Sequence, residues 1–233
     1  MKILIFGKRN KKLSSAIATL TLPSGYTCPG SKSCHAKANR VTGKIIDSKN
    51  LTFRCYHCSL EACFPNVRQK AWHNFDLLKG KSKQEMIELI QESLPNKLVI
   101  RPGEGGDFFN QDYFDAWLEV AKLNKHILFY AYTKSINFWI KRLKDIPKNF
   151  ILTASYGGKY DSLISKYNLK HSKVFNTIED ARREKYKIDI DDSLARNKSI
   201  KKIGLLLHGN GPAGSFQARL FKSSNQKKMI AAR

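Results

Sequence analysis

Short apolar runs alternate with helical patterns through the second half of the chain, and this alternation restricts the fold more than any other feature. Each run has the length and composition of a buried strand. Amphipathic segments between the runs predict helices. Strands that alternate with helices indicate an α/β fold with a parallel sheet covered by helices, either an open sheet or part of a (β/α) barrel. The predicted strands are 97–101, 126–132, 149–155, 172–176 and 203–208.

The first third of the chain has a different character, but no linker separates it from the repeats. A polar connector with turn signals runs from 35 to 54. Helices are predicted to begin at Pro65, after Ser82, where Glu85 completes a capping box, and after the caps Asn110 and Thr177. The expected division is a cysteine-rich region at 1–80, βα repeats forming a partial barrel at 81–222 and a flexible basic tail at 223–233, all in one structural unit.

The loops that follow the predicted strands are candidate ligand contacts, because ligands of such folds bind beyond the carboxyl ends of the strands. In RPGEGGDFF, glycines allow close approach of the backbone to a ligand, and two acidic residues supply charge. HGNGPAGS follows the last strand and precedes a helix. Glycine after a strand is also typical of a simple tight turn. The candidate cofactor-binding residues are Glu104, Gly105, Gly106, Asp107, His208 and Gly209.

A separate acidic segment, KIDIDDSLA, contains Asp189, Asp191 and Asp192. The default interpretation of such a segment is a solvated turn. The alternative is a site for a divalent metal ion, since carboxylates are its preferred ligands.

Five cysteines in the first third of the chain form the strongest chemical signal. They are Cys28, Cys34, Cys55, Cys58 and Cys63. Thiolates are soft ligands that suit zinc or iron–sulfur clusters, and clustered cysteines in a cytosolic protein indicate metal more than disulfides. A zinc ribbon would need two short cysteine pairs, and only one is present. His35 and His57 are candidate substitute ligands, and the alternative interpretation is a set of free buried cysteines.

The chain is strongly basic, with 42 Lys and Arg against 19 Asp and Glu and a formal net charge of +23. Such a charge attracts polyanions, so DNA or RNA is an expected partner, bound mainly through its phosphates. The alternative is that the charge serves solubility. No apolar run approaches the roughly 20 residues of a membrane span, and GKRNKK directly follows the short apolar start. We therefore expect no membrane partner and a cytoplasmic location.

Several segments, spread in order over nearly the whole chain, resemble the phage "gene product eighty-eight" family. They are LPSGYTCPGSKSCHAKA, FRCYHCSLEA, FPNVRQKAWHNFDLL, GGDFFNQDYFDAWLEVAK, FYAYTKS and LLLHGNGPAGS. That family is similar to radical-SAM-type proteins, which hold a four-iron cluster on three cysteines in front of a partial TIM-type barrel.

The resemblance implies a [4Fe-4S] cluster on Cys28, Cys34 and Cys55. Cys58 and Cys63 are additional to the family pattern, and either could be a fourth ligand. GEGGDFF corresponds to a segment that meets the methionine part of S-adenosylmethionine, with Asp107 and Glu104 on the ammonium group. The chain lacks the compact C-x3-C-x2-C loop of radical-SAM enzymes, so the resemblance implies the cluster and leaves the reaction open.

Two functions are therefore expected as alternatives. The first is a phage-encoded iron–sulfur protein in the host bacterial cytoplasm, redox active with an electron donor and associated with nucleic acid. If it is an enzyme, the implied reaction is reductive cleavage of S-adenosylmethionine, with the HGNGPAGS loop holding an anionic group. The second is a non-enzymatic nucleic-acid-binding replication or takeover factor, in which zinc or a cluster is structural.

Overall fold

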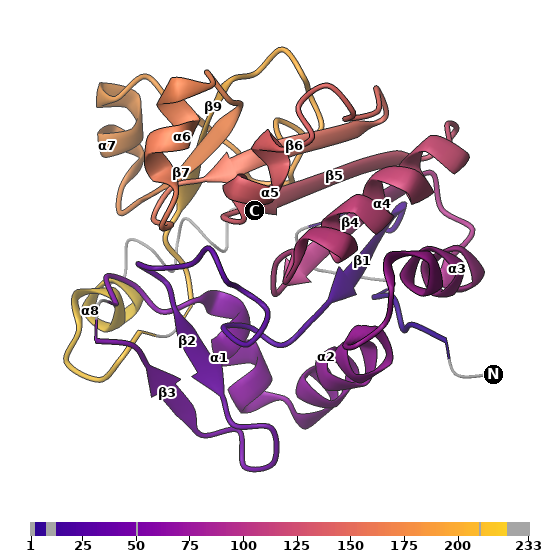
Figure 1. The fold of residues 1–233 in the computed structure, drawn as a ribbon. Coiled ribbons are helices and arrows are strands. Elements are labelled where there is room, and N and C mark those ends of the chain that lie inside the picture. Colours follow the sequence, from indigo (N-terminus) through magenta and orange to yellow (C-terminus); the bar gives the residue numbers. More distant parts are fainter. Residues whose placement is uncertain (1–2, 8–12, 50, 210, 223–233) are drawn as a thin grey trace.

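A single parallel sheet organises the chain (Figure 1). The computed structural model describes residues 3–7, 13–49, 51–209 and 211–222. All strand pairs within this sheet are parallel. In sheet order its strands are β1 (Ile17–Thr21), β4 (Val99–Gly105), β5 (Leu128–Thr133), β6 (Phe150–Ser155), β7 (His171–Phe175), β9 (Lys202–Leu206) and β8 (Lys187–Ile188).

Helices cover one face of this sheet. Apolar side chains on alternate strand positions, such as Leu20, Ile100 and Phe129, are buried there with Trp117 and Met86 from the helices. The predicted caps Ser82 and Asn110 do begin helices, each accepting a hydrogen bond from a backbone N–H of the first turn. The helices are α1 (Tyr56–Cys63), α2 (Pro65–Leu78), α3 (Lys83–Ser93), α4 (Gln111–Leu123), α5 (Ile136–Ile140), α6 (Asp161–Lys166), α7 (Ile178–Arg183) and α8 (Phe216–Lys222).

The opposite face of the sheet is covered by residues 189–200. Leu194 and Ala195 of this segment pack with Tyr130 of β5 and Ile203 of β9. Asp192 lies among them with 1% of its surface exposed, paired with Arg101 of β4 at 2.6 Å. Tyr130 also donates a hydrogen bond to Asp192. The prediction of a solvated turn is therefore wrong for Asp192, and it is also wrong for Asp189, which is 3% exposed.

A closed barrel is not formed by the described residues. The sheet order follows the chain order from β1 to β7, as in a barrel, but β1 and β8 are edge strands and do not pair with each other. Residues 189–200 occupy the space that closure would enclose. The α/β class and the parallel sheet are confirmed, and the fold is an open sheet with a filled inner face.

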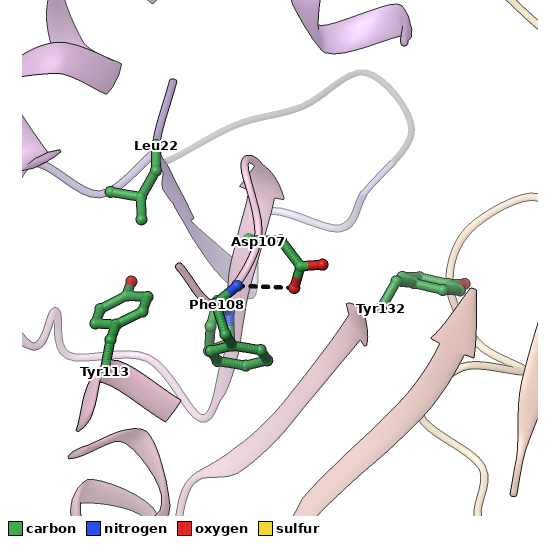
Figure 2. Close-up of a pocket in the computed structure, with 7 residues that line it drawn as sticks. Leu22, Asp107, Phe108, Tyr113 and Tyr132 are labelled. Atoms are coloured by element: carbon green, nitrogen blue, oxygen red, sulfur yellow. Dashed lines mark hydrogen bonds between the residues drawn. The ribbon is translucent and has the colours of Figure 1, made fainter. Parts of the chain in front are cut away.

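Strand β4 separates from β5 toward its carboxyl end. The two strands are paired only at Val99 and Ile100 of β4. Pro102 follows and has no N–H to donate, and Gly103 has a φ of 76°, which favours glycine. A small pocket opens at this separation, between Leu22 on one side and Tyr132 on the other (Figure 2).

The N-terminal third contributes β1 to the sheet and then builds a layer at the carboxyl ends of the strands (Figure 1). The predicted polar connector contains an antiparallel hairpin of β2 (Ala36–Ala38) and β3 (Ile45–Asp47). Helix α1 was missed as well, and it packs on β2 through Cys58. The predicted tail lies outside the described residues. No helix among the described residues is long and apolar enough to cross a membrane.

The ion pair between Arg101 and Asp192 generates a stability prediction. Arg101→Met leaves the Asp192 carboxylate buried without its cation, so we expect the free energy of unfolding to fall by about 3 kcal/mol. Arg142→Met is the matched control, because it breaks an Arg–Asp pair in which the arginine side chain is 38% exposed. That change should cost about 1 kcal/mol or less. Urea denaturation measures both, and equal losses would contradict the structural role of the buried pair.

Candidate functional site

The loop that carries Cys28 and Cys34 is fixed across the carboxyl ends of β5 and β6. The backbone N–H groups of Lys32 and Ser33 donate to the carbonyl of Gly157, which follows β6. In return, Lys159 N–H donates to the carbonyl of Gly30. A side chain at Gly30 would collide with the carbonyl of Lys134, which follows β5. The cysteine loop and the strand ends are therefore in backbone contact.

Cys55 comes to the same rim from helix α1. It is the N-cap residue of that helix, and the backbone N–H groups of His57 and Cys58 lower the pKa of its thiol, which favours the thiolate. The start of the helix is held by Gln217 of α8, whose amide oxygen accepts from the Arg54 N–H at 2.7 Å. The Cys28 sulfur likewise accepts from the Gly25 N–H at 3.3 Å.

Cys28, Cys34 and Cys55 lie close enough for their charges to interact. Burial raises the pKa of the Cys28 thiol well above its usual range, and the charges of Asp107, Cys55 and Cys34 raise it further. Burial and the charge of Cys34 raise the pKa of Cys55 to about 11. Bringing several thiolates together is therefore unfavourable unless a cation or a metal centre compensates their charge.

The remaining two cysteines have different surroundings. Cys58 is fully buried and packs with Ala36 and Ala38 of β2, and burial is the main cause of its raised pKa. Cys63 is exposed at the end of α1. Of the two, only Cys58 interacts electrostatically with Cys55, and it does so from the apolar contact with the hairpin.

A buried polar pair lies behind the cysteines. His57 Nδ1 is 3.1 Å from a carboxylate oxygen of Glu61, and the two side chains are 3% and 0% exposed. The same oxygen accepts the Ser24 N–H. Gly105 of β4 lies directly beneath the His57 ring, and a Cβ at that position would collide with it. The predicted substitute ligand His57 is thus held by Glu61. The other, His35, is hydrogen-bonded to Ser31 at 2.6 Å.

Asp107 anchors the strand ends to each other. Its carboxylate accepts four hydrogen bonds, from the hydroxyl of Thr133 and from the N–H groups of Phe108, Lys134 and Ser135. Burial raises its pKa although these hydrogen bonds oppose the shift. Figure 2 shows the carboxylate beside Phe108 at the edge of the small pocket. The geometry favours a role in joining β4 to β5 and leaves little capacity to bind a ligand's ammonium group.

Three other candidate residues of the two glycine-containing loops meet at Tyr56, which sequence reasoning missed. The Tyr56 hydroxyl donates to the Glu104 carbonyl at 2.9 Å. Its ring is 4.8 Å from that of His208, and Gly209 lies against its Cβ. Tyr56 directly follows Cys55, so the ends of β4 and β9 border the cysteine site. Gly106 packs beneath Thr27 and Leu22, next to the cysteine loop.

Within the described residues, no group of three or more His, Cys, Asp or Glu side chains is placed to hold a metal ion. Cys28, Cys34 and Cys55 thus lie within electrostatic reach of one another without a preformed single-ion geometry. The Gly25 N–H donates to the Cys28 sulfur, and the N–H groups of His57 and Cys58 lower the pKa of Cys55.

The pKa of Cys55 generates a test on metal-free protein. Only the thiolate reacts with iodoacetamide, so a thiol with a pKa near 11 should be labelled roughly a hundredfold faster at pH 10 than at pH 8. An ordinary thiol with a pKa of 9.0 should gain only about tenfold. Peptide mass spectrometry of the labelled chain gives both rates. A Cys55 profile that levels off near pH 9 would contradict the buried environment.

Comparison with known proteins agrees with the resemblance noted in the sequence. No curated protein and no solved structure matches the chain. The family described as Gene product 88 matches residues 4–228, which is nearly the full length. The protein therefore belongs to the Gene product 88 family.

Proposed function

We propose that this protein binds an iron–sulfur cluster through Cys28, Cys34 and Cys55. The observation that carries the proposal is that these three thiols lie within electrostatic reach of one another at the rim of the sheet. They come from two separate segments. Backbone contacts fix the Cys28–Cys34 loop to strand ends, and contact of the His57 ring with Gly105 holds the segment of Cys55. A cluster would compensate the thiolate charges that otherwise raise one another's pKa.

The donor set fits a cluster in two respects. The ligands are thiolates, which iron–sulfur clusters prefer. The Gly25 N–H already donates to the Cys28 sulfur, and the N–H groups of His57 and Cys58 favour the Cys55 thiolate. Hydrogen bonds to cysteine sulfur are a common means by which proteins adjust cluster potentials. When bound, the cluster supplies single-electron transfer. The chain's own residues hold the thiolates, limit their contact with water and fix the loops.

The surroundings of Cys58 and Cys63 favour three cysteine ligands. Cys58 is fully buried against the β2–β3 hairpin, and its removal from there would open a gap beside Ala36 and Ala38. Cys63 is exposed at the far end of α1. The proposed function does not include binding of S-adenosylmethionine. The Asp107 carboxylate expected to bind its ammonium group already accepts four hydrogen bonds.

A structural zinc ion is the second candidate, and His35 favours it. Burial and the charges of Lys37 and Lys159 lower the pKa of His35, so its ring is neutral near pH 7. Neutral imidazole and three thiolates would make a four-ligand zinc site. The two candidates differ in colour and in metal content.

Anaerobic purification tests the proposal directly. We expect a brown protein with broad absorbance near 400 nm and equal amounts of iron and acid-labile sulfide. Cys28→Ala, Cys34→Ala and Cys55→Ala should each lose most of the iron, since each removes one ligand of three. Metal analysis and absorbance spectra measure the loss.

Two substitutions serve as matched controls within the same cysteine-rich region. Cys58→Ala and Cys63→Ala should keep both iron and colour, although Cys58→Ala should also lower stability by removing a buried side chain. A colourless protein with one zinc per chain would overturn the cluster. Iron lost from Cys63→Ala but kept by Cys34→Ala would overturn the ligand assignment.

A further inference from the structure

We propose that Lys37, Tyr26, Trp72 and Arg40 form a binding surface for single-stranded nucleic acid. In this series two adjacent aromatic rings are flanked by one cation at each end, and it is here called the cation–aromatic ladder. The series joins the β2–β3 hairpin to helix α2. It is independent of the proposed cluster, because none of its contacts involves a cysteine.

The geometry of the ladder is regular. The Lys37 ammonium lies 4.9 Å from the centre of the Tyr26 ring. The Tyr26 and Trp72 rings are 4.8 Å apart, edge to face. The Arg40 guanidinium lies 4.8 Å from the centre of the Trp72 ring, and Asp76 accepts two hydrogen bonds from it. Each ring is therefore already beside a cation, an arrangement that favours contact with an electron-rich base and its phosphate.

The ladder is accessible and rigidly supported. Tyr26 is 38% exposed, and the Arg40 side chain is 50% exposed. Trp72 is half-buried and contacts Phe75, which in turn contacts Phe109 at 5.3 Å near the main core. Rings held in place lose little conformational entropy on binding, which suits a stacking platform.

The charge around the ladder favours a polyanion. Residues 26–79 contain nine Lys and Arg against three Asp and Glu. Two of these acids, Asp47 and Asp76, pair with arginines, and Glu61 is fully buried. Lys32, Lys44 and Lys49 are exposed nearby in the sequence. Exposed positive charge without compensating acids attracts phosphates from a distance.

A single strand fits this surface better than a duplex, because only unpaired bases offer their faces for stacking. Several other aromatic side chains are too buried for such stacking. Tyr130, Phe108 and Trp139 are 0%, 3% and 7% exposed and lie in the core. The ladder is assembled from the β1–β2 loop, the hairpin and α2, which come together only in the fold.

Tryptophan fluorescence provides a specific readout. The chain has three tryptophans, and Trp117 and Trp139 are buried, so a stacked base should quench Trp72 selectively. We expect a labelled 20-nucleotide oligo(dT) to bind by anisotropy and to quench the emission. Affinity should fall at least about tenfold between 50 and 200 mM salt. Trp72→Phe should keep binding, because a ring remains, and abolish the quenching.

Substitutions in the ladder test the contacts. Tyr26→Ser should weaken binding of the oligonucleotide about tenfold through loss of one stacking partner. Lys37→Gln should weaken it less and reduce the salt dependence. Tyr167→Ser is the matched control, because Tyr167 is also an exposed tyrosine, 40% accessible, with Lys166 above its ring at 5.7 Å. It follows α6, far from α2 in Figure 1, and should leave binding unchanged.

Three outcomes would overturn the proposal. The first is no binding of the oligonucleotide at 50 mM salt. The second is equal binding of single-stranded and duplex DNA with no quenching. The third is equal weakening by Tyr26→Ser and Tyr167→Ser. Heparin, a polyanion without bases, should compete for the surface but leave the Trp72 emission unchanged, and quenching by heparin would contradict stacking.

Discussion

Direct backbone contact between the cysteine loop and the strand ends is the constraint on which the rest of the site depends. At Gly30 the loop lies against the carbonyl of Lys134, and at Gly105 strand β4 lies against the His57 ring, with no room for a Cβ at either place. Hydrogen bonds from the loop to Gly157 and from Lys159 to the loop complete the connection. Because both contacts are made at strand ends, the positions of Cys28 and Cys55 follow from the geometry of the sheet.

The two faces of the sheet serve this arrangement differently. The outer face is an apolar core with helices, as expected for a parallel sheet. The inner face contains a buried ion pair and tyrosine hydroxyls directed at residues 189–200. Lys170 also holds this segment, donating to the carbonyls of Leu194, Asn197 and Ile200. Because these polar contacts hold residues 189–200 against the inner face of the sheet, that face offers no room for a ligand. The rim at the carboxyl ends of the strands remains open to one.

The sequence was most informative where the determinants are local. Apolar runs predicted the strands, and Ser82, Asn110 and Thr177 were found as caps because their side chains bond to nearby backbone groups. The hairpin and α1 were missed because they are short and depend on packing around Cys58. The burial of Asp192 could not be predicted, because its partner Arg101 is distant in the chain. The loops expected at the carboxyl ends of the strands do lie beside one another there, but the specific contacts of Asp107 and Tyr56 required the fold.

The most direct test of the account is X-ray absorption at the iron edge on anaerobically purified protein. If Cys28, Cys34 and Cys55 hold an iron–sulfur cluster, the spectrum should show sulfur neighbours together with a short iron–iron distance. Sulfur neighbours without an iron–iron contribution would indicate a single ion, and the absence of iron beside a zinc–sulfur signal would contradict the cluster altogether.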